Sequence, residues 1–308
     1  MTFLAATLNA RDFEHANFIT REFYAILGNG VMSSLEGLFD SFGNTVDQAG
    51  YLVGQMPEEF APNVWNLVEN INMFVILPIA GVIFTALLAF ELITLIMQKN
   101  SFAEIDHNLF LKWALKFIVG IVILANTFNI VNGIFAVSQF VIRSTSTAVT
   151  GDENPIEVEI GVPEGFTDAL LAMQFGEILL LWVALIIIHF VLVFVNIGVV
   201  LIVINRFIEI FMYTSLAVVP MATLANSEMS HTGKNYIKTL LAIGFQGVLI
   251  VIILSIFGAL MTDVLEGMAA ASGGDFENNI WMIAGFGILL VFGLSKTGAI
   301  SQKIMGAA

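Results

Sequence analysis

The residues that could do enzymatic chemistry form no catalytic pattern in this sequence. The motif HTGKN at 231–235 resembles the end of a phosphate-binding loop, but Glu228 stands where the first glycine of that loop belongs, and Asn235 stands where its hydroxyl residue belongs. The four histidines are scattered without ligand spacing, and the chain has no cysteine for thiol chemistry or a zinc site. We therefore expect no enzyme activity, no bound metal and no cofactor.

Polar side chains within apolar stretches carry more information, because they are costly in a bilayer and usually face protein or water there. Asn126, Asn129 and Asn132 recur every third residue and predict an asparagine stripe on one face of a helix. Such side chains either line a conduit or hydrogen-bond neighbouring helices together, and both interpretations stay open. The complete set of these candidates is Glu91, Asn126, Asn129, Asn132, His189, Asn196 and Gln246.

A second set of candidates stands where apolar stretches begin or end. Arg206 and Glu209 are three residues apart, which is within pairing distance on a helix, and we interpret this pair as a structural anchor. Lysines beside a membrane commonly contact anionic lipid head groups, but they can also bind a cytoplasmic partner. The complete set of candidate cytoplasmic contacts is Lys99, Lys112, Lys116, Arg206, Glu209, Pro220, Lys234 and Lys238.

The elements that position these residues are membrane helices by composition. The chain is 58% hydrophobic and 12% charged, whereas soluble globular proteins contain about 25% charged residues. Its net charge of −14 argues against a large basic surface for nucleic acid. Long apolar blocks favour an all-α polytopic membrane protein over a β-barrel. We predict about five spans, which need about 20 apolar residues each, at 70–97, 117–142, 178–205, 239–262 and 278–295.

The basic residues predict the orientation of these spans. Three segments carry a net positive charge, and we place them in the cytoplasm: 99–116, 205–238 and the tail 296–308. Three other segments are strongly acidic, and we place them outside: 1–70, 143–177 and 263–277. The N-terminus is then extracytoplasmic, the C-terminus is cytoplasmic, and 143–177 forms a large acidic extracytoplasmic loop.

The apolar stretch 207–225 is the ambiguous element of this topology. If it crossed the membrane, the basic loop after it would lie outside and the acidic loop 263–277 inside, against the charge rule. Pro220 also removes a backbone donor, and the chain from Phe207 to Val219 reaches only about 20 Å as a helix. We therefore interpret 207–225 as a re-entrant or interfacial helix on the cytoplasmic side.

The N-terminal 70 residues predict a separate region of amphipathic helices. Apolar side chains recur there at helical spacing, with acidic residues between them: Val31, Leu35, Leu38, Phe39, Phe42 and Val46. The motifs GNG at 28–30 and PEEFAP at 57–62 predict breaks. We expect residues 1–70 to lie on the outer membrane surface or against neighbouring subunits, and 71–308 to form the transmembrane domain.

Several motifs, in this order, resemble the membrane core of TrbL-type polytopic proteins, and they are closest to the branch found on conjugative elements of Gram-positive bacteria. They are PIAG (78–81), ELI (91–93), KN (99–100), FLKW (110–113), NTFNI (126–130), RFIEIFMYTSLAVVPMATLAN (206–226) and GKNYIKTLLAIGFQG (233–247). The resemblance covers about residues 65–295 and contains no catalytic signature.

The resemblance implies a channel or scaffold subunit of a conjugative type IV secretion system in the cytoplasmic membrane. It also implies a homo-oligomeric ring, expected to be a pentamer, that helps pass single-stranded DNA with its relaxase. The implied partners are other inner-membrane subunits, cytoplasmic ATPases and membrane lipids. A stand-alone transporter of small molecules or ions, and an assembly factor that lines no conduit, remain the alternatives.

Overall fold

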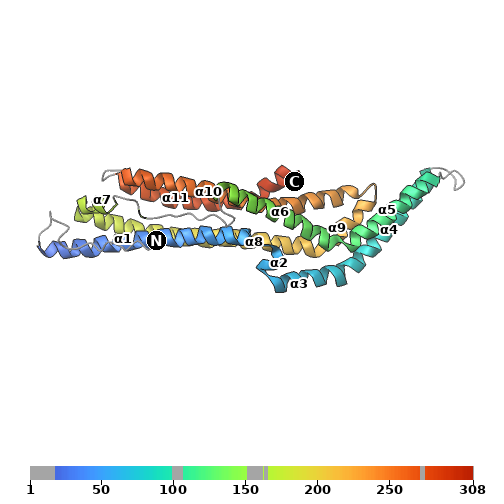
Figure 1. Ribbon diagram of the computed structural model, residues 1–308, viewed down its shortest axis with the longest axis horizontal. Helices are drawn as coiled ribbons and strands as arrows, with labels where there is room; N and C mark the ends of the chain where they lie inside the picture. The colour runs from blue at the N-terminus through green and yellow to red at the C-terminus, as the bar shows by residue number, and fades with distance from the viewer. Residues whose placement is uncertain (1–17, 99–106, 151–161, 163–165, 271–274, 308) are drawn as a thin grey trace. The chain divides into compact units, whose positions relative to one another are not determined.

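Every regular element in the part of the chain that the structure describes is a helix. The computed structural model describes residues 18–98, 107–150, 162, 166–270 and 275–307 (Figure 1). The α-helices are α1 (Phe18–Val53), α2 (Pro57–Phe60), α3 (Pro62–Asn70), α4 (Leu77–Gln98), α5 (His107–Ala125), α6 (Thr127–Thr150), α7 (Phe166–Ala172), α8 (Phe175–Leu216), α9 (Val218–Ala222), α10 (Ser230–Ala270) and α11 (Asp275–Met305). A π-helical turn, Ile71–Ile76, joins α3 to α4, and a 3₁₀ turn, Thr223–Ala225, follows α9.

Four of the described helical segments are long and apolar enough to cross a bilayer: Pro62–Met97, Phe175–Leu216, Ser230–Val264 and Ile280–Met305. Helices α5 and α6 form a fifth candidate only as a pair, because the chain bends by 66° between them. The prediction of an all-α polytopic membrane protein with about five spans is therefore confirmed.

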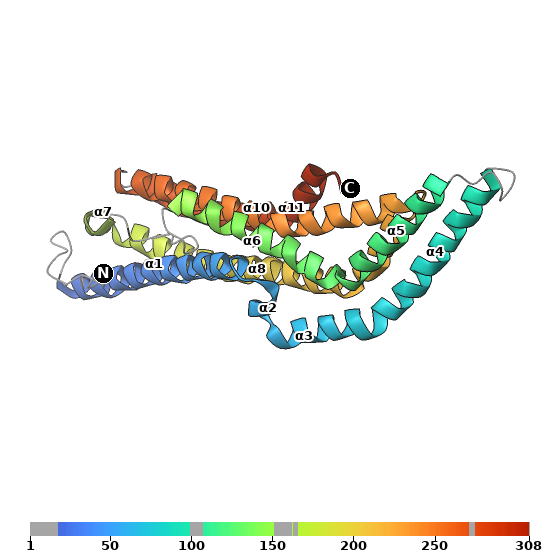
Figure 2. The ribbon, with the colours of Figure 1, turned by 45° about the vertical axis from the view of Figure 1, so that its right-hand side comes forward.

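The stretch 117–142, expected as one span, consists of two helices that meet at Asn126. The Asn126 side chain donates to the Val122 carbonyl at 2.8 Å, and the Thr127 hydroxyl donates to the Ile123 carbonyl at 2.9 Å. These side-chain donors occupy carbonyls at the end of α5 and compete with the regular helical ladder. Figure 2 shows the resulting bend, with α5 lying beside α4.

Helix α8 continues through Arg206 and ends at Leu216, so no new element begins at residue 207. The break lies four residues before Pro220, because a proline ring clashes with the carbonyl four residues earlier in a helix. Pro220 itself sits inside the short helix α9, where its carbonyl accepts the Thr223 hydroxyl at 2.7 Å. The placement of 207–225 as a re-entrant or interfacial segment that does not cross the membrane stays a prediction.

The chain forms two compact units. Unit 1 consists of residues 1–51, 146–202 and 250–295. Its described part contains the amphipathic helix predicted for the N-terminal region, and all six of the apolar side chains named above are buried on it. The Phe42 ring of α1 packs on the Phe257 ring of α10, with 4.9 Å between centroids.

The helix break predicted at GNG is wrong, because α1 runs without interruption through residues 28–30. A Cβ atom at Gly30 would lie 3.3 Å from the indole nitrogen of Trp182 on α8. The glycine therefore serves the close approach of two helices rather than a turn. The predicted break at 57–62 is present, since α2 ends at Phe60 and α3 begins at Pro62.

Unit 2 consists of residues 52–145, 203–249 and 296–308. Helices α4, α5 and α9 share an apolar core in this unit: Ala80, Phe84, Leu88, Leu124, Val218 and Ala222. Upstream of that core, the Phe60 ring stacks on the Phe207 ring of α8 at 4.0 Å between centroids. The chain passes from unit 1 to unit 2 after Tyr51, and the division into an extracytoplasmic region 1–70 and a transmembrane domain 71–308 stays a prediction.

Candidate functional site

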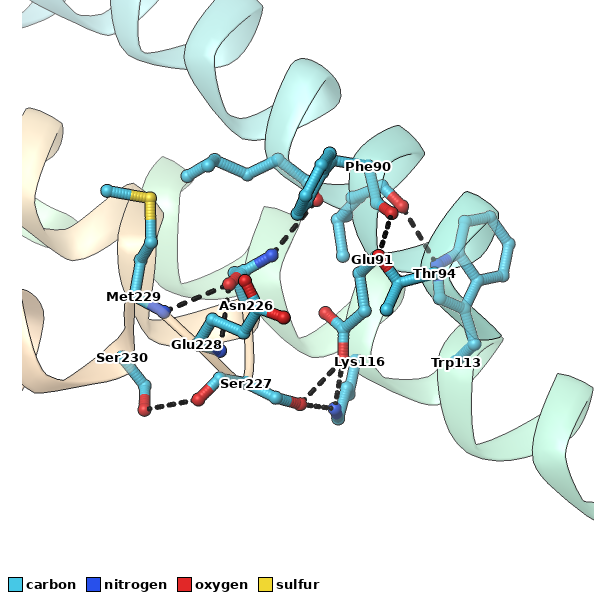
Figure 3. A network of polar contacts seen from close by, with 12 residues as sticks. Phe90, Glu91, Thr94, Trp113, Lys116, Asn226, Ser227, Glu228, Met229 and Ser230 are labelled. Carbon is cyan, nitrogen blue, oxygen red and sulfur yellow. Dashed lines mark hydrogen bonds and ion pairs between the residues drawn. The ribbon is translucent and has the colours of Figure 1, made fainter. Parts of the chain in front are cut away.

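The first polar cluster of unit 2 joins α4, α5 and the turn before α10 (Figure 3). Glu91 of α4 is only 8% exposed. Its Oε1 atom accepts hydrogen bonds from the Lys116 Nζ atom at 2.5 Å and from the Ser227 hydroxyl at 2.7 Å. Lys116 also donates to the Ser227 Oγ atom at 2.7 Å. The carboxylate thus ties two helices and a turn that are distant in the sequence.

The two oxygens of the Glu91 carboxylate differ. Oε1 receives both donors, whereas Oε2 is buried and has no hydrogen-bond partner among the described residues. A buried carboxylate oxygen without a donor is destabilising. The Lys116 side chain, in contrast, is 42% exposed, so its half of the ion pair borders on the surface of the chain.

Asn226 extends this cluster to the backbone of α4 (Figure 3). Its side-chain nitrogen donates to the Leu87 carbonyl at 3.1 Å, and its side-chain oxygen accepts the backbone N–H groups of Glu228 and Met229 at 2.9 and 3.0 Å. The same residue therefore initiates the turn that leads into α10 and fixes that turn to α4.

The indole of Trp113 completes the contact between α5 and α4. It donates to the Leu88 carbonyl at 3.2 Å. We use the name Glu91 cluster for Glu91, Trp113, Lys116, Asn226 and Ser227.

The second polar cluster surrounds Arg206 of α8, which is 3% exposed. Its guanidinium donates to the backbone carbonyls of Ile243 and Gly244 on α10 at 3.3 Å each, and to the carbonyl of Val53 at 3.5 Å. Val53 is the last residue of α1. A cation is favourable there, because the carbonyl end of a helix carries partial negative charge.

Gln139 of α6 also donates to the Val53 carbonyl, at 3.3 Å. The Arg206 cluster, defined as Arg206, Gln139 and the carbonyls of Val53, Ile243 and Gly244, therefore joins four helices. The pair expected between Arg206 and Glu209 is not formed, since Glu209 accepts instead from the Asn205 side chain at 2.8 Å. Backbone dipoles, rather than a carboxylate, surround the buried guanidinium.

Two glycines on α10 make room for this cluster. A Cβ atom at Gly247 would lie 2.8 Å from the Arg206 Cζ atom. A Cβ atom at Gly244 would collide with the Ser138 side chain of α6. These glycines let two helices approach the backbone of α10 closely.

The remaining intramembrane candidates are dispersed. Asn126 and Asn129 are exposed, whereas Asn132 is half-buried with a buried side-chain oxygen that has no partner in the described chain. Gln246 donates to the Thr297 hydroxyl of α11 at 3.3 Å. In unit 1, Asn196 donates to the Ser41 hydroxyl at 3.1 Å.

The candidate cytoplasmic contacts are mostly on the surface. Lys112, Lys234 and Lys238 are exposed, and Pro220 is half-buried. Lys238 donates to the Gly306 carbonyl near the end of α11 at 3.3 Å. Lys99 lies outside the described residues.

Sequence reasoning missed several members of these clusters. Gln139 lies inside a charge-free stretch, where a polar residue could have been noticed, and so does Asn72, whose side chain donates to the Thr214 carbonyl near the end of α8 at 2.9 Å. Asn226 and Ser227 lie in a polar loop, where nothing in the sequence marks them. Within the described ranges, no three His, Asp or Glu side chains are placed to hold a metal ion.

The comparisons with known proteins agree with the motifs of the sequence. The model of the TrbL/VirB6 plasmid conjugal transfer like protein family matches residues 43–218, which is more than half of the chain. The matched region contains Glu91, Lys116 and Arg206 and both the bend at Asn126 and the end of α8. No curated protein and no solved structure matches. This chain belongs to the TrbL/VirB6 plasmid conjugal transfer-like family and is a component of a conjugal transfer system.

Proposed function

We propose that this protein is a non-enzymatic channel or scaffold subunit of a conjugative type IV secretion system, and that it helps pass single-stranded DNA with its relaxase across the cytoplasmic membrane. The family match over 43–218 carries this proposal. In this role the cytoplasmic ATPases supply the energy, and a homo-oligomeric ring of this chain, expected to be a pentamer, supplies part of the path.

The two polar clusters support a structural role for the buried candidates. Each cluster joins segments that are far apart in the sequence, as Glu91 and Ser227 are, and hydrogen bonds of this kind hold membrane helices together. We propose that Glu91, Arg206 and Gln246 fix the broken helices of unit 2, whereas the exposed Asn129 is available to face the conduit. The exposed lysines on α5 and α10 would contact ATPases, DNA or lipid.

Crosslinking inside donor cells tests whether DNA touches the chain. A photo-crosslinking amino acid at Asn129 is compared with one at Phe140, which lies on the same helix and is 72% exposed. We expect transferred DNA to be captured at Asn129 and not at Phe140. If no position on the asparagine stripe or in the loops captures DNA, the result favours a scaffold, and if deletion of the gene leaves DNA transfer intact, the proposed function is wrong.

The orientation is a separate proposal: N-terminus outside, C-terminus in the cytoplasm. The chain has no cysteine, so a single Thr232→Cys variant can be labelled selectively. Residue 232 is exposed at the start of α10. We expect a membrane-impermeant maleimide to label it only after the cells are opened, and we expect the same reagent to label an Asp152→Cys variant in intact cells. Labelling of residue 232 in intact cells would reverse the assignment.

A further inference from the structure

Helix α1 lies beside α8 in unit 1 and runs parallel to it (Figures 1 and 2). The Tyr24 hydroxyl accepts the Phe175 backbone N–H at 2.7 Å, and farther along, the Asn196 side chain donates to the Ser41 hydroxyl at 3.1 Å. The offset between contacting residues is 151 for the first pair and 155 for the second. From the first pair to the second, 24 to 41 on α1 and 175 to 196 on α8, the helices advance by 17 and 21 residues, so they run in the same direction with a shift of about one helical turn.

This pairing puts α1 alongside a candidate membrane span. Phe175–Leu216 is the most apolar of the candidate spans, and α1 accompanies it from Phe175 at least to Asn196. At this level, the exposed side chains of α8 suit lipid, with Phe190 64% and Phe194 74% exposed. Hydropathy alone would not identify α1 as a membrane-embedded helix.

The exposed face of α1 at the same level is polar. From residue 33 to residue 48, a length of about 22 Å in a helix, no apolar side chain is exposed. We use the name polar stripe for the exposed residues of this segment: Ser33, Gly37, Asp40, Ser41, Asn44 and Gln48. Glu36 lies four residues before Asp40 and is half-buried beside the stripe.

Helix α8 adds two polar side chains on the side that faces α1. Trp182, His189 and Asn196 are spaced by seven residues, so they share one face of the helix. Trp182 and Asn196 contact α1 at Gly30 and Ser41, and the exposed His189 stands between them along α8. The side-chain oxygen of Asn196 is buried without a partner in the described part of the chain.

A polar face with a carboxylate cannot face hydrocarbon at this depth, because charged side chains in a bilayer require water or a polar partner. A two-fold symmetric contact centred on this stripe would bring Asp40 close to Asp40, which is repulsive. In a ring, by contrast, the stripes of all subunits can face one central space. We propose that the polar stripe, together with His189 and Asn196, lines a water-filled path at bilayer depth that favours cations over anions.

This inference rests on the proposed function for its assembled ring, and it specifies that function further. Acidic groups in a pore wall attract cations and repel phosphates. Such a wall would not hold a DNA strand or its relaxase by electrostatic attraction. The side chains that line the path therefore favour passage over binding.

The absence of cysteine allows a direct accessibility experiment in membranes that contain the whole secretion system. Ser33→Cys and Ser41→Cys on the stripe are compared with Val183→Cys and Phe194→Cys on the exposed apolar face of α8. We expect charged methanethiosulfonate reagents to modify the stripe at least about 10-fold faster than the α8 positions. The cationic reagent should also react about 3-fold faster than the anionic one, and Asp40→Asn should abolish that preference.

Three results would overturn the inference. The first is equally slow modification at both sets of positions. The second is protection of the stripe cysteines from the reagents together with disulfide dimers at residue 41. The third is protection of the stripe cysteines that disappears when a partner subunit is deleted. The second result would assign the stripe to an interface between copies, and the third to a partner. DNA transfer is scored separately. If the stripe cysteines are modified quickly but DNA transfer does not need this gene, the proposed function is refuted and the inference of a water-filled path stands.

Discussion

The Glu91 and Arg206 clusters lie in the same unit, but they neutralise buried charge in different ways. Glu91 is paired with Lys116, whose side chain is 42% exposed. No carboxylate of the described residues pairs with Arg206, and backbone carbonyls from α1 and α10 accept its hydrogen bonds. Side chains at a surface can separate at little cost, whereas helix backbones cannot move without repacking. The difference predicts that substitutions at Arg206 reduce stability more than substitutions in the Glu91 pair do.

The largest expected effect follows from filling the space beside Arg206. Gly247→Val would place side-chain atoms where the guanidinium and the Ile142 side chain now lie. Overpacking of this kind should reduce the free energy of unfolding by about 3 kcal/mol or more, measured by SDS titration in mixed micelles. Gly133→Val on α6 is the matched control, because no described atom beyond its own stretch of helix backbone lies within 4 Å of its Cβ position. An equal loss of unfolding free energy in both variants would show that substitution of any helical glycine is destabilising. The result would then not support a special role for the packing around Arg206.

Removal of the guanidinium itself should have the next largest effect. Arg206→Met deletes three hydrogen bonds to carbonyls and should lower the free energy of unfolding by about 2–3 kcal/mol. Arg206→Lys keeps the charge but cannot reproduce the planar fork of donors, so we expect it to recover less than half of the loss. If Arg206→Lys has the full stability of the unsubstituted chain, the positive charge, and not the geometry of the guanidinium, holds α1, α8 and α10 together.

The Glu91 cluster should respond more weakly. In a double-mutant cycle with Glu91→Gln and Lys116→Met, we expect a coupling energy of about 0.5–1 kcal/mol, because the exposed lysine is screened by solvent. Lys116→Met alone should cost more than Glu91→Gln alone, since it leaves a buried carboxylate without its cation. A coupling energy as large as the loss in Arg206→Met would contradict the distinction between the two clusters.

The sequence predicted the helices and the two charged residues better than it predicted their partners. Bilayer thickness fixes the length of an apolar block, so five spans could be predicted before any contact was known. Four of them match single helices, and the fifth is the bent pair of α5 and α6. Glu91 and Arg206 stood out as charges near such blocks. The partners of Arg206 are backbone carbonyls, which every residue has and which therefore leave no signal in a sequence. Ser227, a partner of Glu91, lies 136 residues away from it, and only the fold brings them together.

The N-terminal helix also shows that contacts between distant residues cannot be predicted from local sequence. Its apolar spacing predicted one buried face correctly, but glycines at 28–30 were interpreted as a turn. A glycine in a helix can equally mark a close contact, and the choice depends on Trp182 of α8, which is distant in the sequence.

The bend at Asn126 connects the two clusters and should produce the smallest change in stability. Helix α5 carries Lys116 to one cluster, and α6 carries Gln139 to the other. Asn126→Leu removes the side-chain bond to the Val122 carbonyl, and because Asn126 is exposed we expect the free energy of unfolding to change by less than about 0.5 kcal/mol. The regular ladder can then extend across residue 126, so the 66° bend should relax slightly, within what the contacts of Lys116 and Gln139 allow. Spin labels at exposed residues 110 and 140 would report a longer distance than in the unsubstituted chain, with Asn129→Leu as the control. An unchanged distance would assign the bend to the packing around the Glu91 and Arg206 clusters rather than to Asn126, and the two clusters would then have to be treated as one.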